Sequence, residues 1–120
     1  MKEFKGSCHC GRIRFRFRTE EIKGAVRCNC SMCLRKGALM SEESYVDFEW
    51  EGNEEDLGVY HWGDLTVNHY FCRHCGIYPF HNGIPHPDFE VKPGYRVNLG
   101  CVDIPNHLEL PVTLIDGRSF

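Results

Sequence analysis

Seven of the eight cysteines in this chain lie in three tight clusters, and their spacing constrains the fold more than any other feature. The clusters are Cys8 and Cys10; Cys28, Cys30 and Cys33; and Cys72 and Cys75. Short Cys-x-Cys and Cys-x-x-Cys pairs are typical of tetrahedral zinc sites, in which thiolate or imidazole ligands surround the metal. Seven sulfur atoms divide naturally into a closed set of four and an open set of three.

The clearest pairing joins the first cluster to the third. Cys8 and Cys10 have spacing two, and in extended backbone such residues point to the same side. Cys72 and Cys75, followed by Gly76, have the spacing of a zinc knuckle, where a residue without Cβ relieves a tight turn. We therefore predict one structural zinc bound by these four cysteines. It would link segments about sixty residues apart and contribute directly to folding.

The middle cluster, formed by Cys28, Cys30 and Cys33, has no obvious fourth ligand. Catalytic zinc sites typically use three protein ligands and leave a position for water or substrate, so a second, labile zinc is predicted here. Three alternatives stay open. In the first, Cys101 or a histidine supplies a fourth ligand and closes the site. In the second, the cysteines are divided differently among the clusters. In the third, they are simply small buried side chains.

Length and charge limit the class of protein. The 120 residues predict a single domain over residues 1–120, and the net charge of −3 argues against a dedicated nucleic-acid-binding protein. The first residues contain no apolar signal segment, and no apolar run is long enough to span a membrane. A cytoplasmic, reducing location is therefore expected, where clustered cysteines indicate metal binding, with disulfides as the less favoured alternative.

Alternation of apolar and polar residues predicts a mainly β fold. The clearest strand covers residues 11–18, where Ile13, Phe15 and Phe17 alternate with arginines. Further strands are expected over residues 24–30, 42–50, 57–62, 65–71, 95–102 and 108–115. A turn at residues 63–64 would join two of them, and residues 80–94 would form a proline-rich loop. Ser31 is expected to cap one helical turn that Gly37 ends.

The seven histidines receive no catalytic assignment from the sequence. His69 lies near the end of the predicted hairpin. His81 and His86 lie in the proline-rich segment, where they either border a site or belong to the surface.

Three segments together resemble the glutathione-dependent formaldehyde-activating enzyme family, which includes centromere-protein-V-like proteins. The segments are Gly6-Ser-Cys-His-Cys-Gly11, Cys28-Asn-Cys-Ser-Met-Cys-Leu-Arg-Lys-Gly-Ala38 and Phe71-Cys-Arg-His-Cys-Gly76. The resemblance covers residues 6–102 and implies an Mss4-like fold, with several small coiled antiparallel sheets and little helix, stapled by zinc. It also implies a structural zinc on the first and third clusters and a catalytic zinc on the middle one.

The resemblance further implies carbon–sulfur lyase activity on a small thiol adduct such as S-hydroxymethylglutathione. On this hypothesis the thiol partner, with glutathione as the first candidate, places its sulfur in the open position of the zinc on the middle cluster, because metal ligation keeps a thiol deprotonated. Arg27, Arg35 or Lys36 would offset negative charge or meet a substrate carboxylate.

Two competing functions remain. The first is a non-catalytic, zinc-stabilised protein-binding module, since the same fold also serves protein partners and a fold does not determine function. The second is thiol redox chemistry at Cys30 and Cys33. This redox function ranks behind both the lyase and the binding module, because the flanking segments lack the βαβ pattern of thioredoxin-like motifs. The oligomeric state is not predicted.

Overall fold

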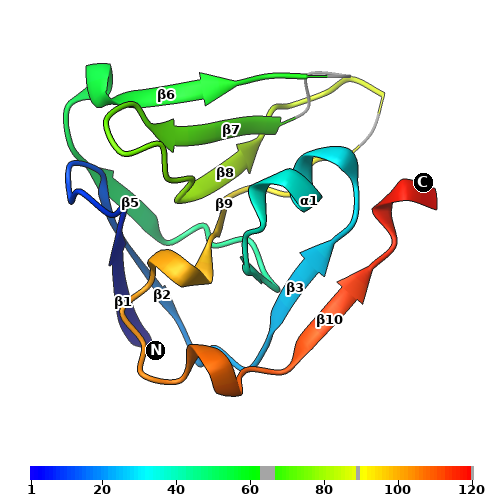
Figure 1. Cartoon of the computed structure of the whole chain (residues 1–120), viewed down its shortest axis with the longest axis horizontal. Coiled ribbons are helices and arrows are strands. Elements are labelled where there is room, and N and C mark those ends of the chain that lie inside the picture. The colour runs from blue at the N-terminus through cyan, green and yellow to red at the C-terminus, as the bar shows by residue number, and fades with distance from the viewer. Residues whose placement is uncertain (63–66, 89, 120) are drawn as a thin grey trace.

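The alternating segment near the N-terminus becomes the central strand of the first of three small sheets (Figure 1). The computed structural model describes residues 1–62, 67–88 and 90–119. In this sheet β2 pairs antiparallel with both neighbours, in the order β1-β2-β5. The bounds are Lys2–Ser7 for β1, Arg14–Thr19 for β2 and Phe48–Glu51 for β5. Phe15 and Phe17 are buried and the arginines beside them are exposed, which confirms the predicted alternation.

The second sheet brings the end of the chain beside the middle cysteine cluster. Its order is β10-β3-β4, with β3 at Ala25–Cys28, β4 at Met40–Ser41 and β10 at Val112–Ile115. β10 pairs parallel with β3, and Ile115 lies opposite Cys28. Antiparallel sheets were expected, but the long chain between β3 and β10 allows β10 to return in the same direction. The helix α1, Ser31–Lys36, follows β3.

The third sheet is antiparallel, in the order β6-β7-β8-β9. Its strands are Leu57–Tyr60, Val67–Cys72, Phe80–Gly83 and Tyr95–Val97. The predicted pairing of the two hairpin strands is confirmed, whereas their predicted turn at residues 63–64 lies outside the described residues. The loop prediction was wrong for residues 80–83. Phe80 is completely buried, and β8 pairs on both sides before the first proline of this segment.

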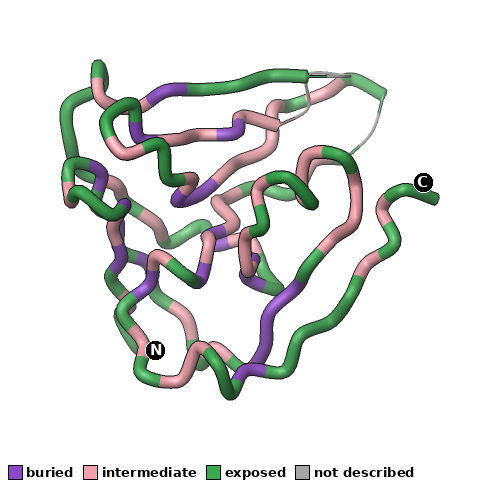
Figure 2. The backbone as a smooth tube through the Cα atoms, viewed as in Figure 1, coloured by how far each residue is buried: buried purple, intermediate pink, exposed green. Residues whose placement is uncertain are grey.

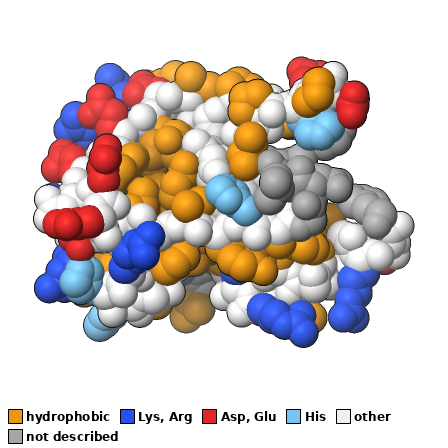
Figure 3. All heavy atoms as spheres, turned by 90° about the horizontal axis from the view of Figure 1, so that it is seen from above, with side chains coloured by type: hydrophobic (Ala, Val, Ile, Leu, Met, Phe, Trp, Pro, Cys, Tyr) orange, Lys and Arg blue, Asp and Glu red, His pale blue; other side chains and the backbone are white. Residues whose placement is uncertain are grey.

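Aromatic side chains form much of the core shared by the first and third sheets. The ring centroids of Phe48 and Tyr95 are 4.1 Å apart, and those of Phe15 and Phe80 are 5.5 Å apart. Buried positions lie toward the interior, where the sheets approach one another (purple in Figure 2). Apolar side chains also gather on the face seen from above in Figure 3. Tyr60, the last residue of β6, and Trp62, which follows it, are exposed large hydrophobic residues.

Helix is limited, in the described residues, to α1 and four short 3-10 turns. These turns are Glu54–Asp56, Leu99–Cys101, His107–Glu109 and Gly117–Ser119. The predicted mainly β fold of small sheets is therefore confirmed, although the strand expected over residues 95–102 ends at Val97. Within the described ranges, no helix has the length and apolar composition needed to cross a bilayer.

Candidate functional site

Four cysteines from distant segments come together between the turn after β1 and the end of β7. The sulfur atoms of Cys8, Cys10, Cys72 and Cys75 all lie within 4.8 Å of one another. The Cys10 sulfur is 3.6 Å from the sulfur of Cys8 and 3.6 Å from that of Cys72. Tetrahedral zinc with zinc–sulfur bonds of about 2.3 Å holds sulfur atoms about 3.8 Å apart. This donor set therefore fits zinc.

The local backbone of this cluster is built from two tight turns. Residues 8–10 enter a turn rather than the predicted extended strand, and Ile13 N–H donates to the Cys8 sulfur at 3.4 Å. Cys75 N–H donates in the same way to the Cys72 sulfur at 3.5 Å. Gly76 has a φ of 76°, a backbone conformation that a residue without Cβ adopts easily, so the tight turn predicted at this position is confirmed. Backbone N–H groups directed at sulfur favour the thiolate form, which is the form that binds metal.

The middle cluster is assembled where β3 passes into α1. The sulfur atoms of Cys28, Cys30 and Cys33 also lie within 4.8 Å of one another. Cys33 N–H donates to the Cys30 sulfur at 3.2 Å, so Cys30 caps α1. The predicted cap, Ser31, is instead the first helical residue. Gly37 ends the helix with a φ of 63°, as predicted.

Burial and hydrogen bonding act differently on two of these thiols. Burial opposes ionisation of Cys30, but hydrogen bonds from Cys33, from Cys28 and from backbone N–H groups together lower its pKa. Burial, together with the neighbouring Cys30 and Cys28, raises the pKa of Cys33 to about 12. A divalent cation deprotonates a coordinating thiol outright. The three sulfurs therefore offer a soft donor set that suits zinc in the metal-bound state.

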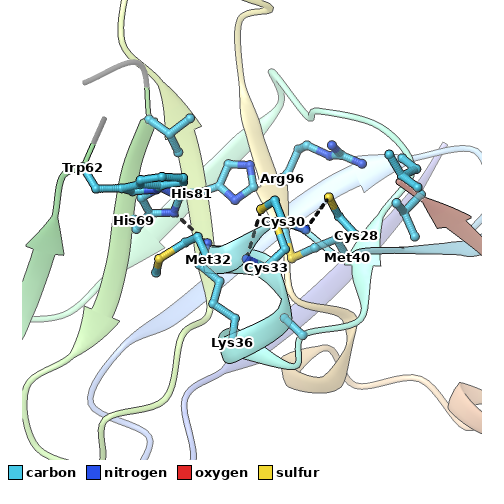
Figure 4. Close-up of a pocket in the computed structure, with 14 residues that line it drawn as sticks. Cys28, Cys30, Met32, Cys33, Lys36, Met40, Trp62, His69, His81 and Arg96 are labelled. Atoms are coloured by element: carbon cyan, nitrogen blue, oxygen red, sulfur yellow. Dashed lines mark hydrogen bonds between the residues drawn. The ribbon is translucent and has the colours of Figure 1, made fainter. Parts of the chain in front are cut away.

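The middle cluster opens into a cavity of about 480 Å³ (Figure 4). All three of its cysteines line this cavity, and none of the four cysteines of the other cluster does. Apolar walls come from four different strands and from the segment after β6, and include Val26, Met40, Trp62, Val67 and Ile115. Pockets for small molecules typically have volumes of about 300–1,000 Å³. The cavity therefore has the size and lining of a small-molecule site.

Two cationic side chains line the cavity. Lys36 Nζ lies 2.7 Å from His69 Nδ1 and 3.7 Å from the centroid of the Tyr78 ring. Burial lowers the pKa of Lys36 to about 8, although the nearby Cys33 and Cys30 oppose this shift. Arg96 donates from Nε and Nη2 to the Ser41 carbonyl at 3.1 and 2.6 Å, which anchors its guanidinium group at the wall.

The sequence predicted only one of the two cationic side chains that line the cavity. Of the three cations that the sequence offered to the middle cluster, Lys36 lines the cavity. Arg27 is exposed on β3, and exposed Arg35 donates to the Ser31 carbonyl at 3.0 Å. Arg96 was not anticipated, because its place depends on the pairing of β9 with β8.

Two histidines also reach the cavity, although the sequence assigned neither a role. His69 on β7 lies opposite His81 on β8, and both side chains line the cavity. Figure 4 shows them on the same side of the three cysteines as Trp62. Of the two alternatives left open for His81, the structure supports the one in which it borders a site. No local sequence signal could have identified this pair, since strand register alone brings the two residues together.

The C-terminal segment holds the middle cluster from the other side. Asn29 N–H donates to the Ile115 carbonyl at 3.1 Å, and Asn29 Nδ2 donates to Asp116 Oδ1 at 2.9 Å. Asn29 Oδ1 in turn accepts from Arg118 N–H at 3.1 Å. A Cβ atom at Gly117 would lie only 2.4 Å from the Cys28 sulfur. Residues 115–118 therefore form a close-fitting clasp around Asn29 and its two neighbouring cysteines.

Gly117→Ala should weaken metal binding by the middle cluster, because the added methyl group displaces the Cys28 sulfur. We expect affinity to fall at least about tenfold, the lower limit found when groups that orient metal ligands are changed. Chelator competition, read by metal release, measures the loss. Thr113→Ala, an exposed change on β10, is the control and should leave affinity unchanged. Equal metal affinity in both variants would contradict the role given to the clasp.

Comparison with known proteins agrees with this geometry. The sequence model of the family described as glutathione-dependent formaldehyde-activating enzyme matches residues 3–114. The fold is also similar to the crystal structure of a Rhodobacter sphaeroides protein, with a TM-score of 0.72 and 33% sequence identity. That match covers 91% of this chain and 99% of the other chain. Because the family match extends over most of the sequence and includes both cysteine clusters, this chain belongs to the glutathione-dependent formaldehyde-activating enzyme family.

Proposed function

We propose that this protein makes or breaks a carbon–sulfur bond in a small thiol adduct, with S-hydroxymethylglutathione as the first candidate. The observation that carries the proposal is the opening of the three-cysteine cluster into the cavity of about 480 Å³. Membership of the family supports a thiol adduct of formaldehyde as the substrate.

Cys28, Cys30 and Cys33 would hold a zinc ion at the base of this cavity, while the other four cysteines would hold a structural zinc. A zinc ion held by only three protein sulfurs would accept one further ligand from outside the protein. Zinc bound there would supply Lewis acidity and keep a substrate thiol in the thiolate form at neutral pH.

The reaction itself needs a balanced transfer of electrons and one proton. In the direction of synthesis, the thiolate adds to the carbonyl carbon, the carbon–sulfur bond forms and the oxygen gains a proton. In the reverse direction the hydroxyl proton leaves, the carbonyl re-forms and the bonding pair returns to sulfur. Lys36 and Arg96 line the cavity and would place positive charge beside an anionic thiol.

Exchange between ¹³C-formaldehyde and its glutathione adduct tests this function directly. Magnetisation-exchange NMR measures the rate of interconversion at equilibrium, and we expect the zinc-loaded protein to raise it well above the uncatalysed rate. A protein that leaves the exchange rate unchanged with glutathione and with other cellular thiols would overturn the proposed function.

Lys36→Met should lower this exchange rate by about 10–100-fold, because it removes the positive charge beside the anionic thiol. A hydrogen bond to a charged group contributes about 1.5–3 kcal/mol. Methionine keeps an apolar stem at the cavity wall and removes the ammonium group. Arg35→Met is the matched control, since it removes the same charge from the exposed face of the same helix. Equal rate losses in the two variants would indicate a general charge effect and contradict a local role for Lys36.

A further inference from the structure

The two histidines that line the cavity have no role in the chemistry proposed above, but their hydrogen bonds determine which nitrogen of each ring carries the proton. A neutral histidine carries one N–H donor and one nitrogen acceptor, and the partner of one nitrogen determines the state of the other. His69 and His81 each have a partner at Nδ1, and they come from neighbouring strands with ring centroids 6.0 Å apart.

At His81 the partner is the hydroxyl group of Tyr78. Burial raises the pKa of Tyr78, so the phenol keeps its proton. Among the described residues, His81 Nδ1 is the partner that the structure gives for this hydroxyl proton. If Nδ1 instead donated to the hydroxyl oxygen, the buried O–H group of Tyr78 would have no acceptor, which is unfavourable. Nδ1 therefore accepts, and the proton of His81 lies on Nε2.

At His69 the partner is Lys36, whose ammonium group can donate but not accept. The distance from Nζ to Nδ1 is 2.7 Å, so this nitrogen also accepts and Nε2 again carries the proton. Burial, followed by the nearby Lys36, lowers the pKa of His69 to about 4. The same two effects lower the pKa of His81 to about 3, so both rings are neutral near pH 7.

Nε2 is the nitrogen that each histidine has left for a ligand. In the described part of the chain, no fully buried side-chain nitrogen or oxygen lacks a hydrogen-bond partner. The structure shows partners for the Nδ1 atoms of His69 and His81 and none for their Nε2 atoms within the described residues, so the Nε2 atoms are accessible. Both side chains line the cavity that holds the three cysteines, and Figure 4 shows them beside that cluster.

We propose that His69 and His81 donate hydrogen bonds from Nε2 to the oxygen of the aldehyde-derived carbon in the thiol adduct. This inference rests on the proposed function. When thiolate adds to the carbonyl carbon, the carbonyl electron pair moves to oxygen, and the two donors stabilise that negative charge until water protonates it. In the reverse direction water accepts the hydroxyl proton, the donors stabilise the alkoxide, and the carbon–sulfur bond breaks with its electrons on sulfur.

In this arrangement Tyr78 and Lys36 are positioning residues, and Lys36 also lines the cavity. They hold the two tautomers before substrate arrives, so the donors need no reorganisation during the reaction. The site therefore selects a substrate with a carbonyl or hydroxyl oxygen on the carbon bonded to sulfur. Simple thioethers of similar size lack that oxygen and leave both donors unpaired.

Long-range ¹H–¹⁵N NMR of the zinc-loaded protein tests the tautomers without measuring activity. We expect the Nε2–H form for both histidines at neutral pH. Tyr78→Phe should shift His81 toward a mixture of tautomers and leave His69 unchanged, while Tyr60→Phe, which changes an exposed ring near His69, should alter neither. The Nδ1–H form at both histidines in the wild-type protein would overturn the inference.

The exchange assay tests the donors themselves. Removing one oxyanion donor typically slows a reaction by about 10²–10³-fold, so His81→Phe should lower the exchange rate by this amount. His81→Gln retains an N–H donor and should keep more of the rate than the phenylalanine variant. An active wild-type protein whose rate is unchanged in His81→Phe would overturn the donor role and leave the proposed function standing. A wild-type protein without exchange activity would overturn both.

Discussion

Cys72→Ser should lose at least about 4 kcal/mol of unfolding free energy, a large share of the roughly 5–15 kcal/mol that stabilises a typical domain. Cys72 is completely buried, and its sulfur lies in a cluster that joins the β1–β2 turn to β7. Structural zinc sites in small domains contribute about 10–16 kcal/mol of metal binding to folding. Opening one corner of the cage therefore removes part of the folding free energy itself.

Thermal unfolding followed by circular dichroism, together with zinc content, measures this effect. For a chain of this size the loss corresponds to a decrease in Tm of more than about 10 °C. Cys101→Ser is the matched control, because Cys101 is a half-buried cysteine outside both clusters, with its sulfur 3.8 Å from the Tyr78 carbonyl. That change should cost about 1 kcal/mol, as most single substitutions do. Equal Tm values for the two variants would refute a structural zinc at Cys72.

Cys33→Ser should abolish metal-dependent thiol binding while the protein remains folded. The three cysteines of the middle cluster lie within six residues, so a metal bound there would tie together a local segment rather than distant strands. Loss of a direct ligand should reduce metal affinity by more than about 100-fold, the upper limit found for changes in groups that only orient the ligands. Tm should fall much less than in Cys72→Ser.

Cobalt substitution gives a direct readout of this prediction. Thiolate-to-cobalt charge-transfer bands change when a sulfur ligand is gained, so glutathione should alter the spectrum of the wild-type protein. S-methylglutathione has nearly the same shape but no thiolate, and it should leave the bands unchanged. Cys33→Ser should remove the response to glutathione, whereas Cys101→Ser should retain it. If a panel of cellular thiols produces no spectral change, the protein-binding module becomes the better hypothesis.

Several features of the fold were predictable because their signals are local. Phe15 and Phe17 are buried as their alternation predicts, and positive φ occurs at Gly37, which ends α1, and at Gly76, in the turn after β7. The errors arose where tertiary contacts outweigh local pattern. The segment beginning at Phe80 forms a strand because both of its edges are paired, and Cys30 replaces Ser31 as the helix cap because its sulfur accepts the Cys33 N–H bond.

The sequence by itself determined the division of the cysteines into sets of four and three, the mainly β class and the family. These depend on spacings of two or three residues, and at such spacings the local backbone directs the side chains to the same side. Only the tertiary structure decided what surrounds the open cluster. His69, His81 and Arg96 meet through strand register, and a shift of one residue in the β7–β8 pairing would turn a histidine to the opposite face of the sheet. Long-range pairing of this kind leaves no local signal, which is why the walls of the cavity became visible only in the folded chain.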